Sequence, residues 1–93
     1  MKLRWSRPAQ RNLSEVQAYI AAENPGGANA TVDRIRRTTE RLRAFPHSGE
    51  ALDVAHLRAT TVPGTFYRII YRVEDDTILV VAIWHGAREW PFD

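Results

Sequence analysis

The segment Thr65–Glu89 reads TFYRIIYRVEDDTILVVAIWHGARE and carries the strongest structural signal in the chain. Within it, an acidic triplet at positions 74–76 separates two runs rich in β-branched and aromatic residues, Phe66–Val73 and Thr77–Trp84. Such residues favour strands, whereas acidic residues are poor strand formers and common turn formers. The pattern therefore predicts a β-hairpin.

If Asp75 and Asp76 form a two-residue loop, the cross-strand pairs on both faces follow. On the apolar and aromatic face the expected pairs are Val73 with Ile78, Tyr71 with Val80, Ile69 with Ala82, and Tyr67 with Trp84. On the face that mixes aliphatics with arginines they are Arg72 with Leu79, Ile70 with Val81, Arg68 with Ile83, and Phe66 with His85. A longer loop would slip this register by one residue. Both faces stay rich in aliphatic residues, more than a chain of 93 residues is expected to cover alone, so the hairpin predicts a protein partner.

The rest of the chain predicts one short strand, two helices and one further strand. The strand candidate Lys2–Ser6 precedes a helix over about residues 8–23, for which Ser6 is the expected N-cap. A second helical pattern runs from near Ala28 to Phe45, an irregular connector covers residues 46–56, and Leu57–Val62 is a strand. We expect a single domain over residues 1–93, of the α+β class and order β-α-α-β-β-β, with the helical hairpin packed on one face of a small antiparallel sheet.

The second helix carries several charges on its outer face. Asp33 and Glu40 lie within three or four positions of neighbouring arginines, a spacing at which side chains on a helix pair. We therefore expect a solvated helix face whose charges are mostly paired internally. Its outward arginines are Arg34, Arg37 and Arg41.

Composition excludes several classes of protein. A hydrophobic content of 44% with 26% charged residues is ordinary for a soluble domain, and the longest apolar run, Ile78–Trp84, is too short to cross a bilayer. The first residues lack the apolar stretch of a secretory signal, and the chain has no cysteine, so we expect a cytoplasmic location without membrane association. The basic residues are arginines apart from Lys2, which fits either a coding bias or a partner that bears carboxylates or phosphates.

No common catalytic or metal motif is present. The three histidines lack the spacing of a zinc site, the serines lack a nucleophile motif, and the glycines form no phosphate loop, so we expect no metal and no cofactor. A basic and polar cluster remains on the second face of the hairpin. Histidine and arginine can serve metal-free RNA cleavage, but arginines beside an apolar groove also bind acidic segments, and the residues alone favour the groove. The cluster comprises Arg68, Arg72, His85 and Arg88, with Arg58 nearby.

Several features together resemble the RelE/ParE toxins of bacterial toxin–antitoxin systems. They are the element order, the Asn24-Pro25 break, Phe45-Pro46 followed by Gly49, the strand from Tyr67 to Val73, and the ending His85-Gly86-Ala87-Arg88. The resemblance covers essentially the whole chain. No single feature is specific, but the ordered set is.

The resemblance allows two mechanisms on one scaffold. RelE-like members cut messenger RNA on the ribosome, and for that activity Arg68, His85 and Arg88 would be the catalytic candidates. The RelE-like lysines are absent beyond Lys2, no tyrosine follows Tyr71, and residues 90–93 read WPFD, so the RelE-like active site is incomplete. The resemblance therefore implies a ParE-like toxin without catalytic residues that poisons DNA gyrase; a protein-binding module that has lost toxicity is a further alternative.

The resemblance also implies a neutralising antitoxin, commonly ParD-like, in a hetero-oligomer with this chain. Such an antitoxin docks by strand addition or as an amphipathic helix. The expected antitoxin-binding residues are Arg68, Ile70, Arg72, Leu79, Val81 and Ile83. The expected target-binding residues are Arg58, His85, Arg88 and Trp90, and we expect no sequence-specific DNA binding by this chain alone.

Overall fold

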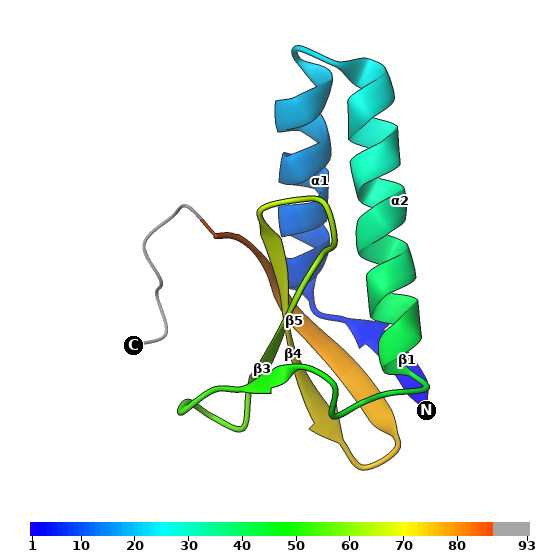
Figure 1. The fold of residues 1–93 in the computed structure, drawn as a ribbon. Helices are drawn as coiled ribbons and strands as arrows, with labels where there is room; N and C mark the ends of the chain where they lie inside the picture. Colours follow the sequence, from blue (N-terminus) through cyan, green and yellow to red (C-terminus); the bar gives the residue numbers. More distant parts are fainter. Residues whose placement is uncertain (87–93) are drawn as a thin grey trace.

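The structure is a computed structural model and describes residues 1–86. The chain begins with β1 (Lys2–Trp5), α1 (Arg7–Ala21) and α2 (Pro25–Leu42). It continues with β2 (Glu50–Ala51), β3 (Arg58–Thr61), β4 (Tyr67–Glu74) and β5 (Thr77–His85). Figure 1 shows the two helices side by side against the sheet, with the turn between them far from it. The predicted α+β fold is confirmed, and the short strand β2 is an addition inside the predicted connector.

The five strands form one sheet in the order β1-β5-β4-β3-β2. Strands β2 to β5 pair antiparallel, whereas β1 pairs parallel to β5. The helical hairpin carries the chain from β1 at one edge to β2 at the other, so the first strand lies beside the last. The sheet is consequently mixed. Neither helix is long and apolar enough to cross a membrane.

Both helices begin with a side-chain cap. The Ser6 hydroxyl accepts a hydrogen bond from the Ala9 N–H at 3.1 Å, as expected for an N-cap. The Asn24 side chain accepts from the Gly27 N–H at 3.0 Å, and Pro25 occupies the first turn of α2. Because the first turn tolerates proline, α2 begins before the predicted position near Ala28.

The hairpin has the predicted two-residue loop, Asp75–Asp76, and the pairs nearest that loop are confirmed. A register shift between Ile70 and Tyr71 then leaves Val81 without a partner in β4. The predicted pairs farther from the loop are therefore wrong. The observed pairs there are Ile70 with Ala82, Ile69 with Ile83, Arg68 with Trp84, and Tyr67 with His85.

The start of α1 stabilises this β-bulge. Strand β1 ends opposite Val80, so the following carbonyl and amide groups of β5 lack a neighbouring strand. The Ser6 hydroxyl donates to the Val81 carbonyl at 3.0 Å, and the Asn12 side chain accepts from the Ile83 N–H at 3.1 Å. The bulge therefore lies where α1 replaces β1 as hydrogen-bond partner, and it turns Ile83 toward the helices.

The side chains divide into two clusters, one on each side of the sheet. The main core lies between the helices and the hairpin, and it includes Leu13, Val16, Ile35, Leu42, Ile69, Tyr71, Ile78, Val80 and Ile83. A smaller cluster on the opposite side comprises Leu57, Ala59 and Ile70, with Leu52, Val54, Val81, Ala82 and Trp84 partly buried against it. Segment 52–57 thus covers part of the sheet face that no helix covers.

The segment between α2 and β3 wraps around one edge of the sheet. Its first part lies on the helix side, where the buried Tyr71 hydroxyl donates to the Pro46 carbonyl at 2.8 Å and accepts from the Gly49 N–H at 2.9 Å. Its second part, residues 52–57, lies on the other side, and Ala55 and His56 take positive φ angles of 48° and 57° in the turn there. Tyr71 therefore anchors the segment as it crosses the edge.

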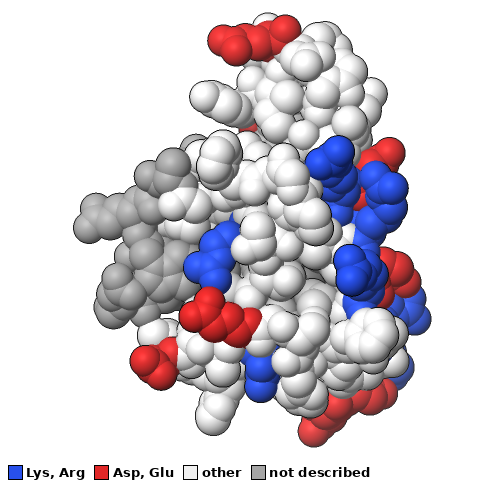
Figure 2. Space-filling model, viewed as in Figure 1, with Lys and Arg blue, Asp and Glu red and all other residues white. Residues whose placement is uncertain are grey.

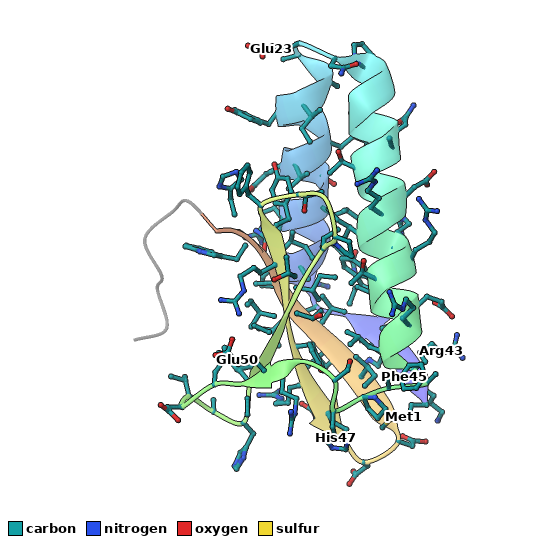
Figure 3. All side chains as sticks on the ribbon, in the orientation of Figure 1. Met1, Glu23, Arg43, Phe45, His47 and Glu50 are labelled. Carbon is teal, nitrogen blue, oxygen red and sulfur yellow. The ribbon has the colours of Figure 1, made fainter. Side chains whose placement is uncertain are left out.

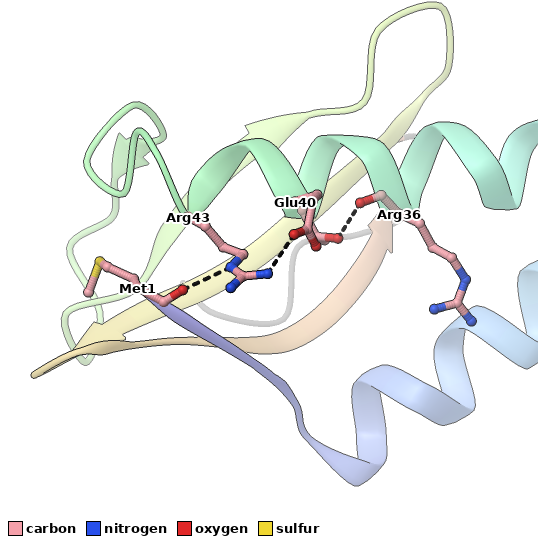
Figure 4. A network of polar contacts seen from close by, with 5 residues as sticks. Met1, Arg36, Glu40 and Arg43 are labelled. Atoms are coloured by element: carbon pink, nitrogen blue, oxygen red, sulfur yellow. Dashed lines mark hydrogen bonds and ion pairs between the residues drawn. The ribbon is translucent and has the colours of Figure 1, made fainter.

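An arginine joins the N-terminus to the end of α2. The Arg43 Nε donates to the Met1 carbonyl at 2.8 Å, and its terminal nitrogen contacts the Glu40 carboxylate at 2.6 Å (Figure 4). These contacts fix β1 against α2. They also hold the Glu40 carboxylate at the β1 side of the helix.

Candidate functional site

Most of the predicted antitoxin-binding residues lie on the sheet face away from the helices. Arg68, Ile70 and Arg72 alternate along β4, Leu79 pairs with Arg72, and Val81 packs at the edge of the smaller cluster. Ile83 does not belong with them. It is 6% exposed in the main core, because the β-bulge turns it toward α1.

The chain itself covers more of this face than the sequence suggested. Ile70 is 0% exposed beneath the aliphatic side chains of segment 52–57, and Leu79 and Val81 are half-buried. The prediction that the hairpin leaves its aliphatics uncovered is therefore wrong for Ile70 and Ile83. The exposed large hydrophobic residues of the described part lie elsewhere: Met1, Tyr19, Phe45 and Phe66.

The arginines on this face have carboxylate partners within the chain. Arg68 pairs with Glu50 at 3.1 Å, and Arg72 pairs with Glu74 at 2.5 Å. Both pairs are partly exposed, so an acidic partner can compete for the arginines at little cost. The face therefore presents replaceable ion pairs above a shallow apolar surface.

Arg58 lies apart from these arginines. It pairs in register with Tyr71, whose side chain belongs to the helix-side core. Its guanidinium donates to the Gly49 carbonyl at 2.8 Å and to the His47 carbonyl at 3.3 Å. Arg58 thus holds the segment after α2 in place, and the expectation that it joins the basic cluster on the second face is wrong.

His85 also lies on the helix side of the sheet. It pairs with Tyr67, and the two rings meet edge to face with their centroids 5.1 Å apart. Arg68 pairs with Trp84 and so points to the opposite side, which separates the two described residues of the RNA-cleavage hypothesis. Arg88 and Trp90 lie outside the described residues, so their predicted roles stay predictions.

A cleft of about 160 Å³ opens between α1 and the end of the hairpin, next to His85. Asn12, Glu15 and Tyr19 line one wall, spaced so that they share one face of α1. The sequence analysis did not identify these residues, although their helical spacing can be read from the sequence. The wall offers carboxylate, amide and phenol groups, which suit hydrogen bonding to a partner. Within residues 1–86, no three His, Asp or Glu side chains are grouped to hold a metal ion.

Comparison with known proteins places this fold among bacterial toxins. Residues 3–90 match the model of the family described as ParE toxin of type II toxin-antitoxin system, parDE. A relative from Sinorhizobium fredii, named "Putative toxin Y4kP", is 30% identical over 90 residues, which cover 97% of this chain and 93% of the relative.

Solved structures share the fold at low sequence identity. A chain of the chromosomal ParDE system from P. aeruginosa superposes with a TM-score of 0.83 at 23% identity, covering 91% of this chain and 95% of its own length. A chain of the E. coli RelBE complex has a TM-score of 0.69 at 11% identity, with 94% and 98% covered. A chain of the RelBE2 complex from Mycobacterium tuberculosis has a TM-score of 0.66 at 20% identity, with 90% and 95% covered. With the family match over nearly its whole length, the chain belongs to the ParE toxin family of type II toxin–antitoxin systems.

Proposed function

We propose that this toxin inhibits growth by acting on DNA gyrase in the cytoplasm, and that a ParD-like antitoxin neutralises it in a hetero-oligomer. The match over residues 3–90 to the ParE family supports the ParE-like branch. The higher TM-score to the ParDE chain, 0.83 against 0.69 for the E. coli RelBE chain, points the same way.

The separation of Arg68 from His85 is the observation that carries the choice of target. Metal-free cleavage of RNA needs a base, an acid and a cation arranged around one phosphate. The observed register puts Arg68 on the open face and His85 on the helix face. This separation favours a toxin that acts by recognising a protein target over an endoribonuclease.

For the antitoxin, the proposed contact surface is the sheet face that carries Arg68 and Arg72. Leu79 and Val81 supply half-buried aliphatic contacts, while Ile70 supports the surface from beneath. Acidic side chains of the antitoxin would replace Glu50 and Glu74 as partners of the arginines.

For gyrase, the proposed contact surface is the cleft beside His85, together with Arg88 and Trp90. Two of the exposed aromatics, Tyr19 and Phe66, adjoin His85: Tyr19 lines the same cleft, and the Phe66 ring centroid is 6.1 Å from that of His85. Exposed aromatics beside hydrogen-bonding groups are common anchors in protein interfaces. Arg58 is not part of this surface, because its guanidinium donates to the carbonyls of His47 and Gly49 in the segment after α2.

The experiment is to express the chain with and without the protein encoded by the adjacent gene, and to assay the purified toxin. Growth arrest that the neighbouring protein relieves, with loss of gyrase supercoiling in vitro and intact transcripts in a translation reaction, is the expected result. Transcripts cut on ribosomes while gyrase stays active would replace the proposal with an endoribonuclease. Growth without arrest, with a stable complex, would leave an antitoxin-binding module.

Two histidine variants sharpen this test. His85→Gln removes an imidazole from the cleft, and His47→Gln changes an exposed side chain on the connector as the matched control. We expect His85→Gln to weaken gyrase inhibition about tenfold and His47→Gln to leave it unchanged. Equal inhibition by both variants would remove the cleft from the proposed target surface.

A further inference from the structure

A second recessed surface lies between α2 and β3, away from the sheet face and the cleft discussed above. Two adjoining hollows of about 330 and 490 Å³ share Thr38, Arg41 and Pro63 in their walls. Together they form one groove, which we name the α2 groove. Arg34 and Arg37 line it at one end and Phe45 at the other.

The three arginines of the α2 groove form one stripe. Positions 37 and 41 follow position 34 by three and seven residues, so the three side chains follow a single face of the helix over about 10 Å. Figure 2 shows basic side chains gathered along this helix. The Arg34 guanidinium donates to the Pro63 carbonyl at 3.2 Å and so closes one wall of the groove.

The carboxylates expected to pair with this stripe do not do so. Glu40 contacts Arg43 at 2.6 Å on the β1 side of the helix (Figure 4). Arg37 donates to the backbone carbonyl of Asp33 at 3.4 Å, not to its carboxylate. No ion pair among residues 1–86 includes a groove arginine, so the prediction of an internally paired helix face is wrong for this stripe.

The end of the α2 groove around Phe45 carries apolar side chains. Phe45, labelled in Figure 3 just past the end of α2, is 63% exposed, and Leu42 and Pro63 lie beside it in the walls. Contact with an apolar partner residue would remove the Phe45 side chain from water and so favour binding. Charge and apolar surface therefore occur side by side, as in a site for an amphipathic polypeptide.

The groove also borders an open stretch of sheet edge. The Val62 N–H donates to the Tyr67 carbonyl at 2.9 Å, and the alternation of an antiparallel ladder then turns the N–H and C=O of Thr61 away from β4. Strand β2 pairs only with Arg58 and Ala59, so it does not reach Thr61. An extended segment in the groove would find one donor and one acceptor there.

We propose that the α2 groove binds an acidic, extended segment of the antitoxin, in addition to the sheet face described above. The inference rests on the proposed function for the source of this segment. The groove arginines, which have no carboxylate partner among residues 1–86, select carboxylates. Phe45 receives an apolar side chain, and Thr61 bonds to the backbone of the segment. A nucleic acid fits less well because one end of the groove is apolar and the net charge of the chain is only +2.

The test compares two double variants at the same helical spacing. Arg37→Gln with Arg41→Gln removes exposed charge from the groove, and Arg7→Gln with Arg11→Gln removes exposed charge from α1 as the control. Binding is measured by titrating each variant with the purified protein of the adjacent gene at low and high salt. We expect about 30-fold weaker binding for the groove variant at low salt, less than threefold for the control, and a smaller difference at high salt.

The outcomes separate this inference from the proposed function. A wild-type chain that does not bind the neighbouring protein contradicts both. If the wild-type chain binds tightly and both double variants bind equally tightly, the inference about the α2 groove is overturned, but the proposed function is not. A 20-base-pair duplex is titrated in parallel, and loss of duplex binding with unchanged antitoxin binding would make the groove a phosphate site and overturn the inference.

A conservative variant completes the test. Arg37→Lys with Arg41→Lys keeps both charges but loses the planar guanidinium that bonds carboxylates in pairs. We expect it to recover about tenfold of the lost affinity at low salt. No recovery, with circular dichroism unchanged, would show that positive charge alone does not restore binding and would count against the inference.

Discussion

The two faces of the hairpin bury similar residues under very different covers. Ile69 and Ile70 are neighbours in β4, and each is 0% exposed. Two helices cover Ile69, whereas Ile70 lies beneath segment 52–57. The comparison teaches that a strand rich in aliphatics on both sides indicates burial on both sides but does not identify what covers each one.

The covers differ in how they are held. The helices are capped at their starts, and their apolar residues interlock with the sheet over several turns. Segment 52–57 is closed by two backbone hydrogen bonds between Leu52, Val54 and Leu57, and it depends on the Tyr71 anchor before it. We therefore expect the helix face to be rigid and the other face to adapt more easily.

Replacing Ile69 or Ile70 with alanine tests this difference directly, and we expect these variants to change the free energy of unfolding the most. Ile69→Ala leaves a cavity that helices and sheet cannot close, so we expect a loss of about 3 to 5 kcal/mol in the free energy of unfolding. Ile70→Ala should lose about 2 to 3 kcal/mol, because the segment above it can collapse into part of the space. Urea unfolding of both variants measures the difference. Equal losses would mean that segment 52–57 is as rigid as the helices.

The Tyr71 anchor is the second place to test the comparison. A Cβ at Gly49 would lie 2.6 Å from the Tyr71 hydroxyl and 3.0 Å from the Ala59 carbonyl, so Gly49→Ala should cost about 2 to 3 kcal/mol. Tyr71→Phe leaves the Gly49 N–H and the Pro46 carbonyl without this partner and should cost about 1 to 3 kcal/mol.

Because the hydroxyl is common to both effects, the double variant should lose less than the sum of the two single losses. Thermal or urea unfolding of the three proteins completes the cycle. Additive losses would show that the clash at Gly49 is with the Tyr71 ring and the Ala59 carbonyl, and not with the hydroxyl. The Tyr71 hydroxyl would then contribute less to the position of the segment after α2 than its hydrogen bonds to Gly49 and Pro46 indicate.

Local signals in the sequence predicted most of the fold. Alternation, turn residues and caps depend on neighbours along the chain, and they identified both helices, the hairpin loop and the Ser6 cap. The β-bulge was missed because its cause lies at the other end of the chain, where Ser6 and Asn12 bond to β5. Neither Val81 nor Ala82 is a residue type that indicates a β-bulge.

The candidate sites were harder to predict for the same reason. A bulge of one residue moved Ile83 and His85 to the helix face, and a connector read as irregular supplied the cover for Ile70. The pairing of the charges on α2 was also wrong, because Arg43 takes Glu40 toward Met1, a contact between residues far apart in sequence. The predicted helices, the hairpin loop and the pairs next to that loop held, whereas the pairs beyond the bulge and the charge pairs on α2 failed because distant residues decide them.

The smallest expected effect concerns the ion pair between β4 and β2, the strand that leads into segment 52–57. Arg68 and Glu50 are 3.1 Å apart, but the Glu50 side chain is 71% exposed, so water and salt screen the pair. Glu50→Gln should therefore cost less than about 1 kcal/mol. Asp53→Asn, in segment 52–57 itself, is the matched carboxylate control. Urea unfolding at low and high salt measures both, and the difference between them should vanish at high salt. A loss above about 2 kcal/mol would mean that the ion pair, not the aliphatic cluster around Ile70, holds the segment to the sheet. An acidic partner competing for Arg68 would then loosen the cover as it binds, whereas a small loss leaves the cover intact beneath a bound partner.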